Sequence, residues 1–203
     1  MTVYIGGGTP TTLSPEQLAK IMKTVSDNFD LSGVLEYTVE AGRPDTVTKE
    51  KLLAIKSGGA TRISINPQTM NDSVLESIGR KHTAQQTLEA FLLSRECGFY
   101  NINTDLIAGL SGDTFESFCD TVKKVVALNP ESVTVHSLSM KRSSSLTVNG
   151  EFPEIEMGKI ASDMVDFAYN YLRDSGILPY YMYRQSKTVG NLENVGYAKA
   201  GKE

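Results

Sequence analysis

The chain has 203 residues, of which 40% are hydrophobic and 22% are charged, and its formal net charge is −4. This composition is typical of a single globular domain and excludes disordered and fibrous chains, and a cytoplasmic location is expected because the N-terminus lacks the regions of a signal peptide. The slightly acidic balance argues against nucleic acid and membrane surfaces as partners, and no apolar run approaches the roughly 18 residues of a membrane span.

Strands and helices are predicted to alternate along the sequence. Runs of β-branched and aromatic residues, which predict strands, begin near Thr2, Leu35, Arg62, Asn101 and Ser132. Helical periodicity follows these runs and predicts helices over residues 15–28, 49–57, 72–79, 84–97, 114–128 and 156–175. A final extended segment is expected over residues 178–185. This order is that of repeated β/α units.

Local signals mark the ends of these helices. Capping boxes predict helix starts at Ser14 to Gln17, Thr83 to Gln86 and Asp113 to Glu116. Left-handed glycines that end helices are expected at Gly58, Gly98 and Gly176.

The spacing of the strands limits the architecture. Strand starts lie about 32 residues apart, so a closed eight-unit barrel, for which roughly 250 residues are typical, does not fit in this chain. Length alone leaves open a partial, six-strand barrel and an open doubly wound sheet.

The predicted strands alternate between apolar and polar residues, unlike the continuous apolar runs of strands covered on both faces. One polar face carries Glu36, Thr38, Glu40, Arg62, Ser64, Asn66, Asn103, Asp105, Thr134 and His136. Because helices must cover the apolar face, the polar faces point into a shared interior. That interior is predicted to be wet or to hold a polar ligand; the alternative is a closed polar core whose members pair with one another.

A glycine-rich turn follows the first strand. Gly6, Gly7 and Gly8, followed by Thr9, would let the backbone approach a ligand and bind its ammonium or carboxylate group. The turn lacks the Lys-Ser/Thr ending of a phosphate loop and the spacing of a dinucleotide fingerprint. A tight turn without a ligand is the alternative.

Four motifs in one order carry a family resemblance. They are Gly6-Gly7-Gly8-Thr9-Pro10-Thr11, Glu40-Ala41-Gly42-Arg43-Pro44, Arg62-Ile63-Ser64-Ile65-Asn66-Pro67-Gln68 and Asn103-Thr104-Asp105-Leu106-Ile107-Ala108-Gly109-Leu110. In this order they resemble radical S-adenosylmethionine enzymes of the oxygen-independent coproporphyrinogen III oxidase family. The segments 180–185 and 190–197 resemble the coproporphyrinogen dehydrogenase branch of Gram-positive-type bacteria.

The resemblance implies a fold, an activity and a site. The implied fold is a partial (β/α)6 TIM-like barrel that holds S-adenosylmethionine against a [4Fe-4S] cluster. The implied enzyme decarboxylates two propionates of a porphyrinogen substrate oxidatively, in haem biosynthesis, with a reductant protein such as flavodoxin or ferredoxin. The residues implied to bind the cofactor are Gly6, Gly7, Gly8 and Thr9 with Glu40 at the ammonium, Arg80 at the carboxylate, and Gln68 and Asp105 at the ribose. For Arg80 the alternative is an ion pair with Glu76, and for Asp105 a structural buried carboxylate.

The sequence departs from this family at the cluster. The family's CxxxCxxC loop precedes the glycine motif, which begins here at residue 6, and Cys97 and Cys119 do not have ligand spacing. We expect both cysteines to be buried, the chain to be the central part of one barrel domain incomplete at both ends, and the chain alone to be inactive. No metal ligand is assigned within it.

Other functions and residues remain open at this point. A haem chaperone of the same superfamily and an unrelated sugar-phosphate enzyme are the alternatives. His136 is expected in the interior and His82 in a solvated loop, whereas Lys141, Arg142, Arg184 and Lys187 are either surface charges or partners of substrate propionates.

Overall fold

The computed structural model describes residues 1–139, 154–186 and 188–203. In chain order, the strands are β1 (Thr2–Ile5), β2 (Glu36–Glu40), β3 (Arg62–Ser64), β4 (Ile102–Ala108), β5 (Ser132–Ser137), β6 (Leu178–Tyr183) and β7 (Asn194–Ala198). The helices are α1 (Pro15–Asn28), α2 (Lys49–Ser57), α3 (Asp72–Ser77), α4 (Ala84–Glu96), α5 (Phe115–Ala127) and α7 (Glu154–Asp174). Every predicted helix and strand is present, and most of their observed ends lie within two residues of the predicted ends.

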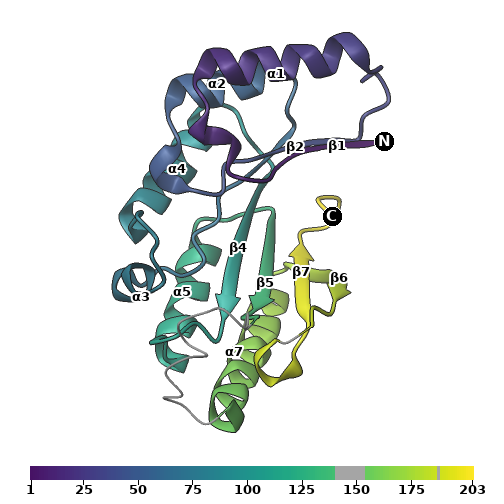
Figure 1. The fold of residues 1–203 in the computed structure, drawn as a ribbon. Helices are drawn as coiled ribbons and strands as arrows, with labels where there is room; N and C mark the ends of the chain where they lie inside the picture. Colours follow the sequence, from purple (N-terminus) through teal and green to yellow (C-terminus); the bar gives the residue numbers. More distant parts are fainter. Residues whose placement is uncertain (140–153, 187) are drawn as a thin grey trace.

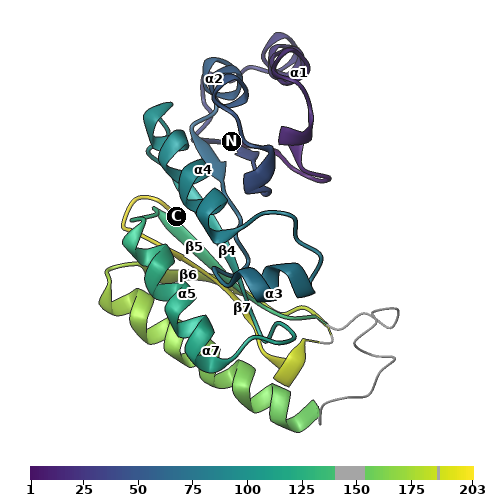
Figure 2. The ribbon, with the colours of Figure 1, turned by 90° about the vertical axis from the view of Figure 1, so that its left-hand side faces the viewer.

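The strands form one curled sheet in the order β1-β2-β3-β4-β5-β7-β6 (Figure 1). The first five strands are parallel, and β7 pairs antiparallel with both β5 and β6. The helices lie in front of the strands in Figure 2, on one face of the sheet. The predicted partial barrel is confirmed, but its last strands form an antiparallel pair that sequence patterns did not reveal.

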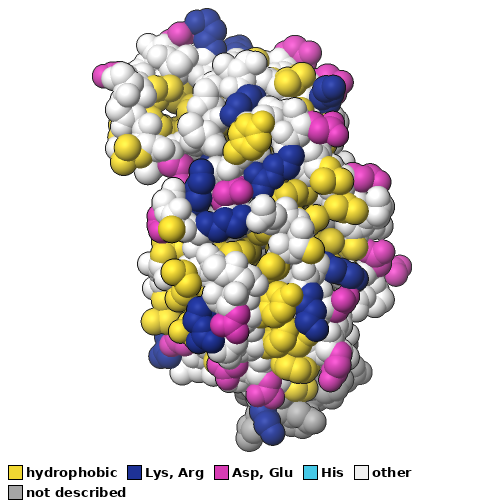
Figure 3. Space-filling model, turned by 180° about the vertical axis from the view of Figure 1, so that it is seen from behind, with side chains coloured by type: hydrophobic (Ala, Val, Ile, Leu, Met, Phe, Trp, Pro, Cys, Tyr) yellow, Lys and Arg dark blue, Asp and Glu magenta, His cyan; other side chains and the backbone are white. Residues whose placement is uncertain are grey.

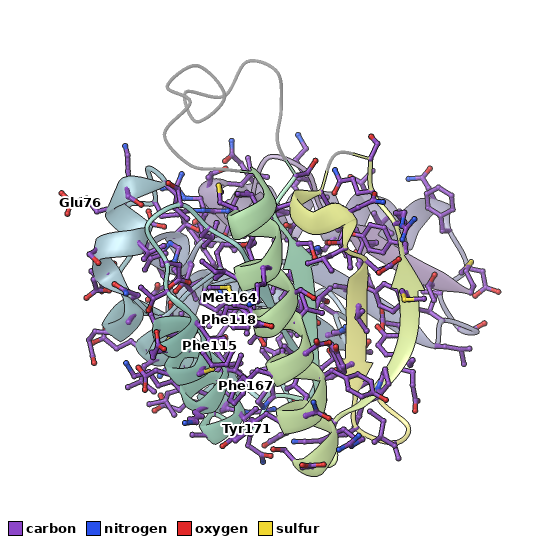
Figure 4. All side chains as sticks on the ribbon, turned by 90° about the horizontal axis from the view of Figure 1, so that it is seen from below. Glu76, Phe115, Phe118, Met164, Phe167 and Tyr171 are labelled. Atoms are coloured by element: carbon purple, nitrogen blue, oxygen red, sulfur yellow. The ribbon has the colours of Figure 1, made fainter. Side chains whose placement is uncertain are left out.

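Two apolar clusters fix the helices on the sheet. One joins β2 and β3 to α1, α2 and α4 through residues such as Met22, Tyr37 and Phe91. The other joins β4, β5 and β7 to α5 and α7, where Phe118 and Met164 are fully buried. Figure 4 shows these two residues between the helices, with Phe115, Phe167 and Tyr171 farther along the same seam. Each cluster covers only the outer face of the strands, so the inner face is left to polar residues.

Two of the predicted helix ends are wrong by one residue. Helix α5 is capped by Thr114, whose hydroxyl accepts from the backbone N–H of Ser117 at 3.2 Å, and not by Asp113. After α2 the left-handed residue is Gly59 (φ 93°), whereas Gly58 has a φ of −76°. A Cβ at Gly58 would lie 2.6 Å from the side chain of Met22, so packing against α1, and not backbone conformation, requires glycine there.

The outer surface carries mixed charge. Lys and Arg side chains are interspersed with Asp and Glu on the face shown in Figure 3. No helix in the described ranges is long and apolar enough to cross a membrane. Lys141, Arg142 and Lys187 lie outside the described residues, and Arg184 is ion-paired with Glu193.

Candidate active site

A cavity of about 260 Å³ opens on the inner face of the sheet. It is lined by polar residues of β2 to β5 and by tyrosines from both ends of the sheet: Tyr4, Thr38, Arg62, Ser64, Asn103, Asp105, Thr134, His136, Tyr180 and Tyr181. The alternation of the parallel strands therefore does direct one polar face into a common interior, as predicted. His136 lies there with the others.

A hydrogen-bond network connects polar side chains of this interior. Arg62 donates to Glu36 Oε2 at 2.7 Å and to Ser132 Oγ at 2.8 Å, and Ser132 in turn donates to Asn103 Oδ1 at 3.0 Å. Asn103 Nδ2 then donates to Asp105 Oδ1 at 2.8 Å. Both predicted alternatives hold in part: these residues pair with one another, and Arg62, Asn103 and Asp105 also line the open cavity.

The glycine turn packs against Glu40. The N–H of Gly7 donates to Glu40 Oε2 at 3.3 Å, and Gly7 has a φ of 111°, which favours glycine. A Cβ at Gly6 would lie 2.2 Å from the ring of Tyr4 and 2.9 Å from Glu40 Oε2. Burial, and then the charge of Glu40, raises the pKa of Tyr4 to about 12, so its hydroxyl stays protonated. The Gly7 N–H and the Glu40 carboxylate thus meet where β1 and β2 end.

Backbone hydrogen bonds hold Gln68 beside Asp105. The N–H of Gln68 donates to the carbonyl of Asp105 at 3.0 Å, and its own carbonyl accepts from Ile107 at 2.9 Å. Gln68 has a φ of 69° and Thr9, after the glycine turn, a φ of 76°, which is costly for residues with a Cβ. Strained backbone at two strand ends is typical of ligand sites.

Arg80 is half-buried near the end of β2. Burial lowers its pKa, the neighbouring charge of Arg43 lowers it further, and Asp45 opposes the shift. Asp45 itself is paired with Arg43 at 2.6 Å. Glu76 extends away from the protein in Figure 4, and Arg80 forms no ion pair with it among the described residues. The alternative for Arg80, an ion pair with Glu76, is therefore not formed among the described residues.

His82 is buried, which contradicts the predicted solvated loop. It is 2% exposed, and its Nε2 lies 3.1 Å from the carbonyl of Pro67, the residue before Gln68. The turn after α3 folds His82 under the end of β3, a long-range contact that residue type does not signal. Burial lowers its pKa despite the hydrogen bond to Pro67, and Arg80 lowers it further.

This lowered pKa predicts a loss of stability in acid. Because unfolded His82 binds a proton below its ordinary pKa and folded His82 does not, the free energy of unfolding should fall as pH drops below about 6.5. The loss is at most about 1.4 kcal/mol per pH unit in that window. Urea unfolding at pH 7.5 and 5.5 should show a smaller acid loss in His82→Gln, with His136→Gln as the control. An equal loss in wild type and His82→Gln would contradict this.

Three tyrosines of β6 form a wall that the sequence analysis did not predict. A bulge at Tyr180 lets both Tyr180 and Tyr181 border the cavity, and Tyr181 stacks on Tyr183 with ring centroids 6.1 Å apart. The hydroxyl of Tyr183 lies 3.3 Å from Nδ1 of His136, whose Nε2 lies 3.8 Å from Asp105. The Tyr-Tyr-x-Tyr spacing signals this wall only once the bulge is known.

Gly196 of β7 makes room for this wall. A Cβ at Gly196 would lie 1.9 Å from the ring of Tyr181, so Gly196→Ala should push that ring out of the cavity. Since Tyr181 is 39% exposed and can move, the expected cost is only about 1 kcal/mol of unfolding free energy. A crystal structure of the variant should show Tyr181 displaced. The ring in its original place, with β7 shifted instead, would be the contrary result.

The sequence matches a known protein family. Residues 2–125, more than half of the chain, match the profile of the Radical SAM superfamily. The chain belongs to the radical SAM superfamily. Its sequence is 43% identical over 203 residues to the oxygen-independent coproporphyrinogen-III oxidase-like protein HemZ of Bacillus subtilis, covering all of this chain and 40% of that protein.

Other radical SAM relatives are also similar. The heme chaperone HemW of B. subtilis is 41% identical over 141 residues, which cover 68% of this chain and 36% of HemW. The structure of coproporphyrinogen III oxidase (HemN) from Escherichia coli superposes with a TM-score of 0.79 at 24% identity, over all of this chain and 44% of HemN. The shared fold is therefore that of the radical SAM partial barrel. The chain spans about 40% of the length of the curated relatives it matches.

The radical SAM family implies S-adenosylmethionine and a [4Fe-4S] cluster, and the described residues fit them differently. Glu40 at the glycine turn and Asp105 at the cavity are carboxylates that suit a cationic ligand, and Asn66 Oδ1 is buried beside Gly42 without a partner. S-adenosylmethionine carries a sulfonium and an ammonium group, so these residues fit it.

The cluster does not fit the residues that the structure describes. No group of three His, Cys, Asp or Glu side chains among them could hold a metal ion. Cys97 and Cys119 are buried, as predicted, and burial raises the pKa of both thiols, which disfavours the thiolate that iron requires.

Proposed function

We propose that this chain forms the cofactor-binding sheet of a radical SAM enzyme that decarboxylates coproporphyrinogen III oxidatively without oxygen. The main support is the glycine turn beside Tyr4 of the cavity, where the N–H of Gly7 donates to Glu40 Oε2 at 3.3 Å. The 43% identity to the coproporphyrinogen-III oxidase-like relative over the whole chain supports the reaction. When bound, S-adenosylmethionine supplies the hydrogen-abstracting chemistry of the superfamily.

Each group of the chain has one task in this proposal. Glu40 accepts from the cofactor ammonium, which the N–H groups of the glycine turn cannot do, and its hydrogen bond to Gly7 fixes the carboxylate. Arg80 binds the cofactor carboxylate, and burial near Arg43 leaves its guanidinium in need of an anion. Asp105 accepts from the ribose hydroxyls, with Gln68 held beside it.

The tyrosine wall is assigned to the substrate side of the cavity. Tyr180 and Tyr181 line the cavity and Tyr183 stacks on Tyr181, so the wall offers aromatic surface that matches the pyrrole rings of a porphyrinogen. Burial raises the pKa of Tyr181 and Tyr183, so both hydroxyls remain donors at neutral pH. A reductant protein of the flavodoxin or ferredoxin type would deliver the electron.

A second candidate is haem binding without turnover. It is favoured by the 41% identity to the heme chaperone HemW, which extends over 68% of this chain. Titration distinguishes the two: the chain contains nine tyrosines and no tryptophan, so a ligand against the wall should quench tyrosine emission. Coproporphyrinogen III should quench it in wild type and less in Tyr181→Ala. A haem Soret shift without any porphyrinogen effect would favour the chaperone role.

Cofactor binding is tested by titrating the 203-residue chain with S-adenosylmethionine. An open site of this size should bind it with a dissociation constant of roughly 0.1–1 mM. Calorimetry at high ligand concentration would measure it, with 5′-methylthioadenosine, which lacks the ammonium and carboxylate, as the matched ligand. Equal affinity for both ligands would contradict the assignment of Glu40 and Arg80.

A further inference from the structure

Lys51 connects the two loops that build the glycine end of the site. Its Nζ donates to the carbonyl of Thr11 at 2.6 Å and to the carbonyl of Thr46 at 3.0 Å. The hydroxyls of Thr11 and Thr46 lie 2.6 Å apart, and Thr46 Oγ1 also donates to the carbonyl of Arg43 at 2.8 Å. The chain between β1 and α1 is thus joined to the chain between β2 and α2.

The position of Lys51 is unfavourable for a lysine of α2 considered alone. Thr48 caps this helix and accepts from the N–H of Lys51, so Lys51 lies in the first turn, three residues after the cap. A cation there opposes the helix dipole, which favours acidic residues such as Glu50 at that end. A residue that breaks a local rule without a local gain is often required by the site it serves.

The two loops joined by Lys51 carry the pair that defines the ammonium site. Gly7 belongs to the first loop, and Glu40 ends β2 directly before the second. Their contact at 3.3 Å spans 33 residues of sequence and is exposed, so it needs support from outside. Thr11 is fully buried, which makes it a firm anchor for the lysine.

We infer that Lys51 is a positioning residue, which holds the glycine turn against Glu40 and thereby sets the affinity for the amino-acid end of the ligand. This inference rests on the proposed function for the identity of that ligand. The joining of the loops itself rests only on the contacts of Lys51.

The test compares Lys51→Met with Lys49→Met, which removes the same charge from an exposed position two residues earlier. In Lys51→Met, affinity for S-adenosylmethionine should fall about tenfold, as is typical when a residue supporting a ligand contact is lost. Affinity for 5′-methylthioadenosine should stay within about twofold, because that ligand does not reach the ammonium site. Lys49→Met should leave both unchanged.

A chemical rescue and an apo measurement complete the test. Aminoethylation of Lys51→Cys restores an ammonium at the same length and should restore the affinity, while the buried Cys97 and Cys119 react little. Amide exchange in residues 7–12 and 42–46 should accelerate together in Lys51→Met without any ligand. Unchanged exchange in both loops, or an equal loss of affinity for both ligands, would overturn the inference. If wild type does not bind S-adenosylmethionine but the exchange still accelerates, the proposed function fails and the loop connection stands.

Discussion

Replacing Glu131 with alanine should lower the free energy of unfolding by about 2–4 kcal/mol, because it leaves the partly buried guanidinium of Arg95 without its anion. Glu131 is 8% exposed and lies directly before β5. Its Oε2 accepts from Arg95 at 2.9 Å and from the N–H of Ile102 at 2.9 Å, so one carboxylate joins the end of α4 to the start of β4. Alanine would also leave the Ile102 N–H buried and unpaired.

Urea unfolding at pH 7, followed by circular dichroism, would measure this loss. Glu89→Ala is the matched control, since Glu89 is exposed on the same helix as Arg95 and should change stability by no more than about 0.5 kcal/mol. If Glu131→Ala cost less than about 1 kcal/mol, Arg95 would have found other partners. The carbonyls of Phe99 and Asn129, which Arg95 also contacts, would then be sufficient.

The second large effect is expected on ligand affinity. Asp105→Asn should weaken binding of S-adenosylmethionine by about 1.5–3 kcal/mol, because a neutral amide replaces a charge-assisted acceptor for the ribose hydroxyls. The amide keeps the shape and can still accept from Asn103, so the unfolding free energy should change little. Because 5′-methylthioadenosine carries the same ribose, its affinity should fall equally.

Glu40→Gln separates the two ends of the ligand. This substitution should weaken the binding of S-adenosylmethionine but not that of 5′-methylthioadenosine, since only S-adenosylmethionine has an ammonium group. Asp120→Asn, which removes an exposed carboxylate paired with Lys124, is the control and should affect neither. A large loss of stability in apo Asp105→Asn with unchanged affinity would make Asp105 a structural carboxylate and remove it from the proposed site.

Much of this fold is predictable because its signals are local. The Ser14 and Thr83 capping boxes form as expected, with both side-chain and backbone bonds present. The alternation of β2 to β5 predicts the polar interior because a parallel sheet keeps successive strands in phase.

The features that sequence analysis missed depend on contacts between distant segments. Strand β7 contains Gly196, which weakens its strand signal, and it becomes a strand because both β5 and β6 offer edges to it. His82 has the composition of a surface loop around it, yet the carbonyl of Pro67 lies above it in the fold. Lys51 looks like any helix lysine until the two loops above it are in place. The local sequence of each segment is therefore not sufficient to predict these three features.

The glycine turn and the tyrosine wall lie far apart in the sequence and at opposite edges of the sheet. The glycine turn, Glu40 and Lys51 lie within the first 51 residues, whereas the tyrosine wall and Gly196 come from residues 178–198, at the opposite edge of the sheet. Mutations in the last quarter of the chain can therefore reshape the wall without touching the glycine turn. A lineage that changed its substrate while keeping its cofactor would be expected to vary at Tyr180, Tyr181, Tyr183 and Gly196, and to stay constant at Gly7, Glu40 and Lys51.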